Sequence, residues 1–254
     1  MKKVIFLLFI LWSLLIINSC KQTFPNKDII LFAKAETVKD EDAIYIMDEN
    51  GRNQIQIAKG KKKGIYLTHP SWSPDGKRII FCRSELKGTD SIISDVYIMN
   101  ADGKKWIRLT KDINALHPKW LPVGEKISFI VGDSKNIGDS KNNIFYLHIM
   151  DIKTRQESKV ITIQGTIFGI SWSPDGKKIV FDSNKNGNSD IYVMEINGTN
   201  QIQLTRSEKS EVTPSWSPDG KKIAFGGFKN WNKYQCIFFG FLVIFSLGCD
   251  IPAT

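Results

Sequence analysis

The chain has 254 residues, of which 42% are apolar and 11% aromatic, and this composition excludes intrinsic disorder because it supplies enough apolar side chains for a core. It carries 35 Lys and Arg against 26 Asp and Glu, which gives a net charge of +9, but the lysines are scattered over expected loops. A nucleic-acid partner is therefore not expected.

Residues 1–19 have the pattern of an export signal. Lys2 and Lys3 precede an uncharged apolar run that ends at Ile17, and this run is shorter than the ~20 residues that a membrane-spanning helix needs. A removable signal peptide is the expected interpretation. This segment should take no part in the folded core.

The end of this signal, Ile17-Asn18-Ser19-Cys20, resembles the lipobox of bacterial lipoproteins. The resemblance implies that Cys20 receives a lipid and becomes the first residue of the mature chain. Ordinary secretion with an incidental cysteine is the alternative. Residues 20–28 are then a polar tether, and the protein is expected in the cell envelope, lipid-anchored, either facing the periplasm or at the outer membrane.

A phrase with the sequence Ser-Trp-Ser-Pro-Asp-Gly occurs three times in the body, and a degraded copy lies between the first two. The tryptophans follow one another at steps of 48, 52 and 44 residues, which is a period typical of β-propeller blades. The residues expected to define the repeats are Trp72, Pro74, Asp75 and Gly76, then Trp120, then Trp172, Pro174, Asp175 and Gly176, then Trp216, Pro218, Asp219 and Gly220.

Each phrase predicts a turn followed by two strands. Proline fixes φ and glycine tolerates the positive φ that ends a tight turn. Short apolar runs follow at 78–81, 126–129, 178–181 and 222–225, and further runs stand at 44–47, 96–99, 145–148 and 191–194. The latter are apolar on both alternating faces, which is typical of strands covered by a sheet on each side. Asn-Gly and Asp-Gly signals then predict a hairpin into a last strand.

With these motifs in view, residues 29–227 resemble the TolB-type β-propeller repeat, a WD40-like pattern. The resemblance implies an all-β fold with four recognisable blades and part of a fifth. A β-sandwich with coincidental turns is the alternative. The strands do not divide evenly, because 29–32 match a second strand with no phrase before them, and 213–225 supply only a first and a second strand. An open or truncated ring is therefore expected.

Residues 228–254 are expected to lie outside the propeller. The stretch from Cys236 to Cys249 is uncharged and has none of the blade features. One hypothesis is that the reading frame leaves the propeller near Gly227 and enters unrelated coding sequence. The alternative is a hydrophobic strand or helix that covers an open sheet edge.

The candidates for chemistry are few. No G-x-S-x-G nucleophile motif is present. His69 and His117 each stand three residues before a repeat tryptophan, so both are expected at the same depth on adjacent blades, facing the channel. Two imidazoles there could begin a site for a divalent metal, as in some lyases built on propellers of this type. The alternative is that each His-Pro pair simply begins a strand.

A second metal candidate is an oxygen-rich segment that resembles a calcium loop. Its ligands would be Asp182, Asn184, Asn186 and Asp190. No glutamate stands at the twelfth position of this segment, and Asn-Gly between two strands also predicts a plain hairpin. No cofactor is expected.

These features predict a noncatalytic, lipid-anchored propeller of the bacterial envelope that binds a protein or glycan partner. Specificity is expected to lie in loops such as 85–95 and 132–143. A metal-dependent polysaccharide lyase is one alternative, and a truncated remnant without function is another. No motif identifies the partner.

Overall fold

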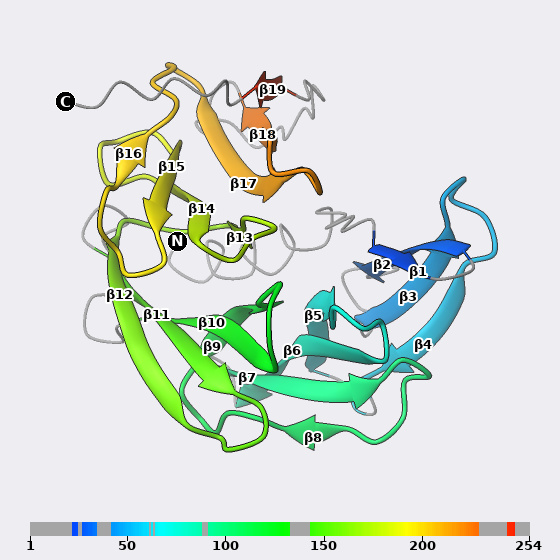
Figure 1. Ribbon diagram of the computed structural model, residues 1–254. Helices are drawn as coiled ribbons and strands as arrows, with labels where there is room; N and C mark the ends of the chain where they lie inside the picture. Colours follow the sequence, from blue (N-terminus) through cyan, green and yellow to red (C-terminus); the bar gives the residue numbers. More distant parts are fainter. Residues whose placement is uncertain are drawn as a thin grey trace. The chain divides into compact units, whose positions relative to one another are not determined.

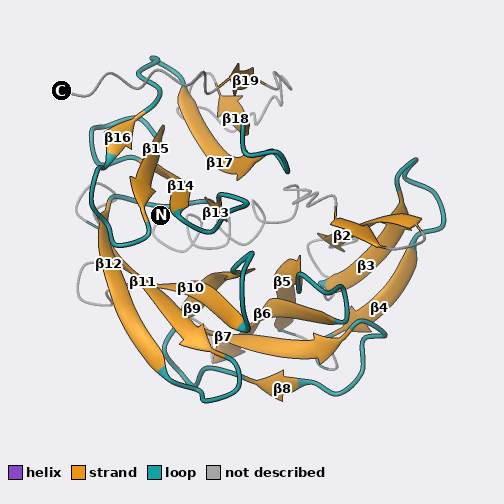
Figure 2. Cartoon of the chain, viewed as in Figure 1, coloured by secondary structure: helices purple, strands orange, loops and turns teal. Residues whose placement is uncertain are grey.

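The computed structural model describes residues 22–24, 27–34, 42–60, 62, 64–87, 91–132, 143–228 and 243–246, which form strands, turns and loops (Figure 1; Figure 2). Among these residues there is no helix, and so none that is long and apolar enough to cross a membrane. The expected signal peptide, Cys20 and most of residues 228–254 lie outside the described residues.

The strands form four four-stranded sheets and one three-stranded sheet, and within each sheet their spatial order follows the chain. The first sheet holds β1 (Gln22–Phe24), β2 (Lys27–Lys34), β3 (Ala43–Asp48) and β4 (Ile55–Lys59). The second holds β5 (Ile65–Trp72), β6 (Arg78–Lys87), β7 (Ser91–Asn100) and β8 (Ile107–Arg108). The third holds β9 (Ala115–Trp120), β10 (Lys126–Gly132), β11 (Ile144–Asp151) and β12 (Glu157–Gln164).

The fourth sheet holds β13 (Ile170–Trp172), β14 (Lys178–Ser183), β15 (Asp190–Glu195) and β16 (Ile202–Gln203). The fifth holds β17 (Ser210–Trp216), β18 (Lys222–Phe228) and β19 (Val243–Ser246). Four complete sheets and a partial fifth confirm the fold predicted from the repeats. The chain divides into two compact units, the first with the first two sheets and the second with the last two.

Two short strands come from segments that the repeat pattern did not include. β1 falls within residues 20–28, the expected tether, and pairs antiparallel with β2, with Gln22 opposite Ile29. β19 falls within residues 228–254 and pairs antiparallel with β18, with Val243 opposite Phe225. The first sheet therefore has a fourth strand and the fifth sheet a third.

Alternate residues of the central strands enter different hydrophobic clusters. In the first unit, Ile79 and Phe81 of β6 pack in one cluster with Leu31, Ile44, Leu67 and Trp72. Ile80, between them in sequence, packs in another cluster with Val96, Trp120, Ile127 and Phe129. This arrangement explains why these strands are apolar on both faces. In the second unit, Val180, Ile191, Ile223 and Phe225 form a further cluster.

Candidate functional site

The position three residues before the repeat tryptophan is a bulge in the first strand of the second, third and fifth sheets. His69, His117 and Thr213 have φ values of 51°, 50° and 55°, in the left-handed region. The pairing of β5 with β6 shifts register between Thr68 and Ser71, on either side of His69. A proline follows each of the three residues and disfavours the right-handed helical region for the residue before it. Such bulges re-aim a side chain away from the regular alternation.

The two bulge histidines of the first unit contact one another. Their ring centroids lie 4.2 Å apart in an edge-to-face arrangement, and both side chains are half-buried. The Nδ1 atom of His69 lies 3.0 Å from Thr68 Oγ1. The structure therefore brings together the two histidines that the sequence placed at the same depth.

Both imidazoles are neutral at pH 7. Burial lowers the pKa of His117 to about 4, and the positive charge of Lys119 acts in the same direction. Burial also holds the pKa of His69 well below its usual value, with further contributions from His117 and Lys119. Neutral imidazoles have free lone pairs for a metal. Among the described residues, however, no group of three or more His, Cys, Asp or Glu side chains gathers that could hold an ion.

In the second unit the same position carries no imidazole. A Cβ on Gly169 would lie 2.6 Å from Thr213 Cα, which is closer than a real contact allows. The backbones approach one another here, so no larger side chain fits at Gly169. The two-histidine arrangement is thus confined to β5 and β9.

The four residues of the expected calcium loop have separate partners. Asp182 is fully buried, and its two oxygens accept hydrogen bonds from the backbone N–H of Phe168 at 2.8 Å and of Thr213 at 3.0 Å. Burial raises the pKa of Asp182 to about 7, although these hydrogen bonds act in the opposite direction. Asn184 Oδ1 accepts a hydrogen bond from the backbone N–H of Thr166, and Asn186 Nδ2 donates one to Tyr192 OH. Asp190 Oδ2 accepts one from Gln203 Nε2.

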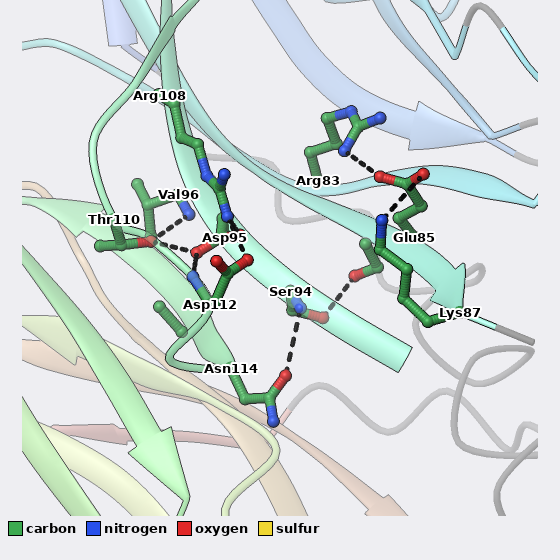
Figure 3. Close-up of polar contacts among 12 residues, drawn as sticks. Arg83, Glu85, Lys87, Ser94, Asp95, Val96, Arg108, Thr110, Asp112 and Asn114 are labelled. Atoms are coloured by element: carbon green, nitrogen blue, oxygen red, sulfur yellow. Dashed lines mark hydrogen bonds and ion pairs between the residues drawn. The ribbon is translucent and has the colours of Figure 1, made fainter. Parts of the chain in front are cut away.

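A polar network in the second sheet was not expected from the sequence (Figure 3). The buried carboxylate of Asp95 forms an ion pair with Arg108 at 2.5 Å and accepts hydrogen bonds from Thr110 Oγ1 at 3.0 Å and from Asp112 N at 2.9 Å. Thr110 Oγ1 in turn accepts from Val96 N at 2.9 Å. The recurrence of Asp before a Val-Tyr or Ile-Tyr pair and of Leu-Thr after the last strand is the sequence signal that could have revealed it.

Two open grooves lie in the first unit. One, of about 540 Å³, lies beside the β3–β4 turn and combines apolar side chains with polar ones: Ile29, Ile46, Met47 and Ile55 with Asp48, Glu49, Asn50 and Asn53. The other, of about 590 Å³, is lined by two turns of the second sheet, residues 75–78 and 100–102. The β6–β7 hairpin, which carries the expected specificity loop 85–95, has strands of ten residues each, and residues 88–90 lie outside the described residues. So do 133–142 of the second expected loop.

Comparison with known proteins shows which family model these repeats match. Residues 139–230 match the family model of the TolB beta propeller domain. A search of curated proteins finds no match. The fold is similar to that of TolB from Acinetobacter baumannii, with a TM-score of 0.62, 24% identity and coverage of 86% of this chain and 49% of that one.

Two other solved structures are similar in fold. The putative TolB of Agrobacterium tumefaciens has a TM-score of 0.60, 20% identity and coverage of 76% of this chain and 65% of that one. An oligogalacturonate lyase in complex with manganese has a TM-score of 0.54, 19% identity and coverage of 74% of this chain and 51% of that one. The chain thus spans about half to two thirds of the length of these proteins. The described residues have the fold of a TolB-type β-propeller, and residues 139–230 carry the sequence of its repeat.

Proposed function

We propose that this protein is a noncatalytic β-propeller of the bacterial cell envelope that binds a protein or glycan partner. The observation that carries the proposal is the TolB-type propeller, whose repeat is recognised in residues 139–230. The open groove beside the β3–β4 turn supports it, because the groove combines apolar with polar side chains, a composition expected of a recognition surface. The lipobox-like sequence before Cys20 supports attachment to the envelope by a lipid.

The anchor is tested with the full chain and a labelled fatty acid. Cys20→Ser should abolish incorporation of the label and move the protein from the membrane fraction to the soluble fraction. Cys82→Ala is the matched control, since Cys82 is a free, fully buried cysteine of β6 and should leave labelling unchanged. Equal labelling of the Cys20→Ser variant and the wild type would exclude the lipid anchor.

Partner binding is tested by cross-linking in intact envelopes, followed by affinity isolation of the full chain. Ile55 lies in the groove and is 56% exposed, whereas Ile107 begins the corresponding outer strand of the second sheet, lies outside the groove and is 52% exposed. Ile55→Lys should remove the cross-linked partner and Ile107→Lys should retain it. Recovery of the same set of molecules by both variants, or of none by the wild type, contradicts binding through this groove.

A second function, a metal-dependent polysaccharide lyase, is favoured by the contact between His69 and His117. A structure of similar fold is described as an oligogalacturonate lyase in complex with manganese. Metal analysis separates the two functions. Stoichiometric manganese that is lost in the His69→Ala, His117→Ala double variant, together with cleavage of an oligogalacturonate, would favour the enzyme.

A further inference from the structure

An equivalent carboxylate in the second and fourth sheets has different hydrogen-bond and ion-pair partners. Asp95 and Asp190 stand at the same position of the repeat, two residues before Tyr97 and Tyr192. These tyrosines are opposite Arg108 and Gln203 respectively, so Arg108 and Gln203 are also equivalent. Arg108 forms a 2.5 Å ion pair with Asp95, whereas Gln203 Nε2 only donates a hydrogen bond of 2.9 Å to Asp190 (Figure 3 shows the Asp95 arrangement). A neutral amide therefore stands where the second sheet has a cation.

The second unit also brings another carboxylate close to Asp190. Glu211 stands two residues before the bulge residue Thr213, the position that Leu67 has before His69. Leu67 is fully buried in a hydrophobic cluster, and Glu211 is only 9% exposed. The backbone N–H of Glu211 donates to the carbonyl oxygen of Ser189, the residue before Asp190. A core leucine position is thus occupied by an acid that adjoins a second buried acid.

Each of these carboxylates has one buried oxygen without a hydrogen-bond partner. Asp190 Oδ1 and Glu211 Oε2 are these atoms, and the other two oxygens accept from Gln203 Nε2 and from Ser207 Oγ. Asp190 is 6% exposed. A buried carboxylate oxygen with no partner costs free energy, so buried polar atoms of this kind are normally satisfied by a donor or by a cation.

The shifted pKa of Asp190 agrees with the lack of a positive charge beside it. The pKa of Asp190 is raised to about 6, chiefly by burial and also by the nearby negative charge of Glu211. Gln203 and Arg206 act in the opposite direction. Arg206 is exposed, and within the described part of the chain no ion pair joins it to either acid. Two adjacent buried carboxylates repel one another, and a positive charge between them would relieve this repulsion.

We propose that Asp190 and Glu211 bind a hard divalent cation of the Ca²⁺ or Mg²⁺ class between β15 and β17. Asp190 Oδ1 and Glu211 Oε2 are its protein ligands, and the ion has the charge-balancing role that the Arg108 guanidinium has beside Asp95. Carboxylate oxygen is the donor that hard cations prefer, and neither histidine nor cysteine takes part. The site is distinct from the histidine pair and does not depend on the function proposed above.

Calorimetry and thermal unfolding of the full chain, freed of metal with a chelator, test this site. Addition of Ca²⁺ should show one-to-one binding and raise the unfolding temperature, with Mg²⁺ as the second probe. Asp190→Asn and Glu211→Gln should each abolish the heat of binding and the shift in unfolding temperature. Asp102→Asn removes an exposed carboxylate elsewhere and should retain both.

Two further variants give the fourth and fifth sheets the residues that the second sheet has at the equivalent positions, and they keep the test informative if the first pair folds poorly. Gln203→Arg places a guanidinium at the position equivalent to Arg108. Glu211→Leu places a leucine at the position equivalent to Leu67. Each should unfold at a higher temperature than the metal-free wild type and should no longer respond to Ca²⁺. The proposal is overturned if the wild type binds neither Ca²⁺ nor Mg²⁺. It is equally overturned if the Asp190→Asn, Glu211→Gln double variant binds Ca²⁺ as the wild type does.

Discussion

At the scale of single residues, the serine that follows three of the four repeat tryptophans stabilises the turn after it. Ser73 Oγ donates to Asp75 Oδ1 at 2.6 Å and accepts from the backbone N–H of Arg78 at 2.9 Å. The same pair of hydrogen bonds is made by Ser173 and by Ser217. The serine hydrogen bond lowers the pKa of Asp75. The Ser-Pro-Asp-Gly sequence therefore encodes a closed network as well as a backbone bend.

Ser173→Ala is expected to lower the free energy of unfolding by about 1–3 kcal/mol, because the N–H of the half-buried Lys178 loses its acceptor and Asp175 loses a donor. Ser173 is 4% exposed. Ser217→Ala removes the same hydrogen bonds at a half-buried site, where water replaces them, and should cost less. Urea titration measures both values. A cost for Ser217→Ala that equals or exceeds that for Ser173→Ala would contradict this explanation.

At the scale of elements, neighbouring sheets approach closely at their turns. Gly103, in the turn after β7, has a φ of +78°, and a Cβ there would lie 1.9 Å from the carbonyl oxygen of Ile57 in β4. Gly51, in the turn after β3, has a φ of +76° and open space around its Cβ position. The two glycines share a backbone conformation but differ in their surroundings.

Gly51→Ala should therefore cost only the strain of a left-handed alanine, about 1–2 kcal/mol. Gly103→Ala should cost clearly more, since the new methyl group meets backbone that cannot rotate away. Thermal and urea unfolding of the two variants give the comparison. Equal costs would show that the close approach of the second-sheet turn to β4 is not required for stability.

The carboxylate of Asp182 links three elements of the second unit. It belongs to β14 and binds the backbone of Phe168, before β13, and of Thr213, in β17. Burial raises its pKa from 3.8 to about 7, so the folded state holds the proton more tightly than the unfolded state does. Its contribution to stability is thus largest at acidic pH and falls as pH rises from about 4 to about 7.

Asp182→Asn removes this titration and leaves one of the two acceptor oxygens. The variant should be less stable than the wild type, and the difference should narrow as the pH rises from 5 to 7. Urea unfolding at a series of pH values measures this difference. A difference that stays constant over the range would mean that Asp182 does not titrate there.

At the scale of the whole molecule, two carboxyl groups and two histidines with shifted pKa values change stability in opposite directions over the same pH range. Burial raises the pKa of Asp42 and of Asp182 to about 7. Burial lowers the pKa of His117 from 6.5 to about 4, and the pKa of His69 is lowered as well. The neutral histidines favour folding above pH 6.5, and this contribution is lost as the pH falls towards 4. The carboxyls have the opposite dependence, so the two effects offset each other.

His117→Gln removes one of the two histidines whose protonation destabilises the folded state at low pH. Relative to the wild type, the variant should gain stability as the pH is lowered from 6.5 to 4.5. Its stability at pH 8 sets the baseline for the loss of the ring contact with His69. A pH dependence that parallels that of the wild type would show that His117 is not buried in its neutral form.

Local features of the sequence were sufficient for the blades. The Trp-Ser-Pro-Asp-Gly phrase and the Asn-Gly or Asp-Gly hairpins mark turns whose geometry depends on a few neighbouring residues, and the strands follow between them. β1 was not predicted, and a strand at β19 was only the alternative for the tail, because the pairing of both depends on a neighbouring strand edge and not on a signal of their own. The contact between His69 and His117 could be anticipated because both occupy one position of the repeat.

The sequence by itself therefore determined the all-β fold, the repeat and the order of strands within each sheet. Only the tertiary structure decided which polar side chains are satisfied. Asp95 and Asp190 have the same local sequence context, yet one meets Arg108 and the other meets Gln203 and Glu211. These partners come from other strands, and the free energy of a buried charge depends on all the groups packed around it, which local sequence does not specify.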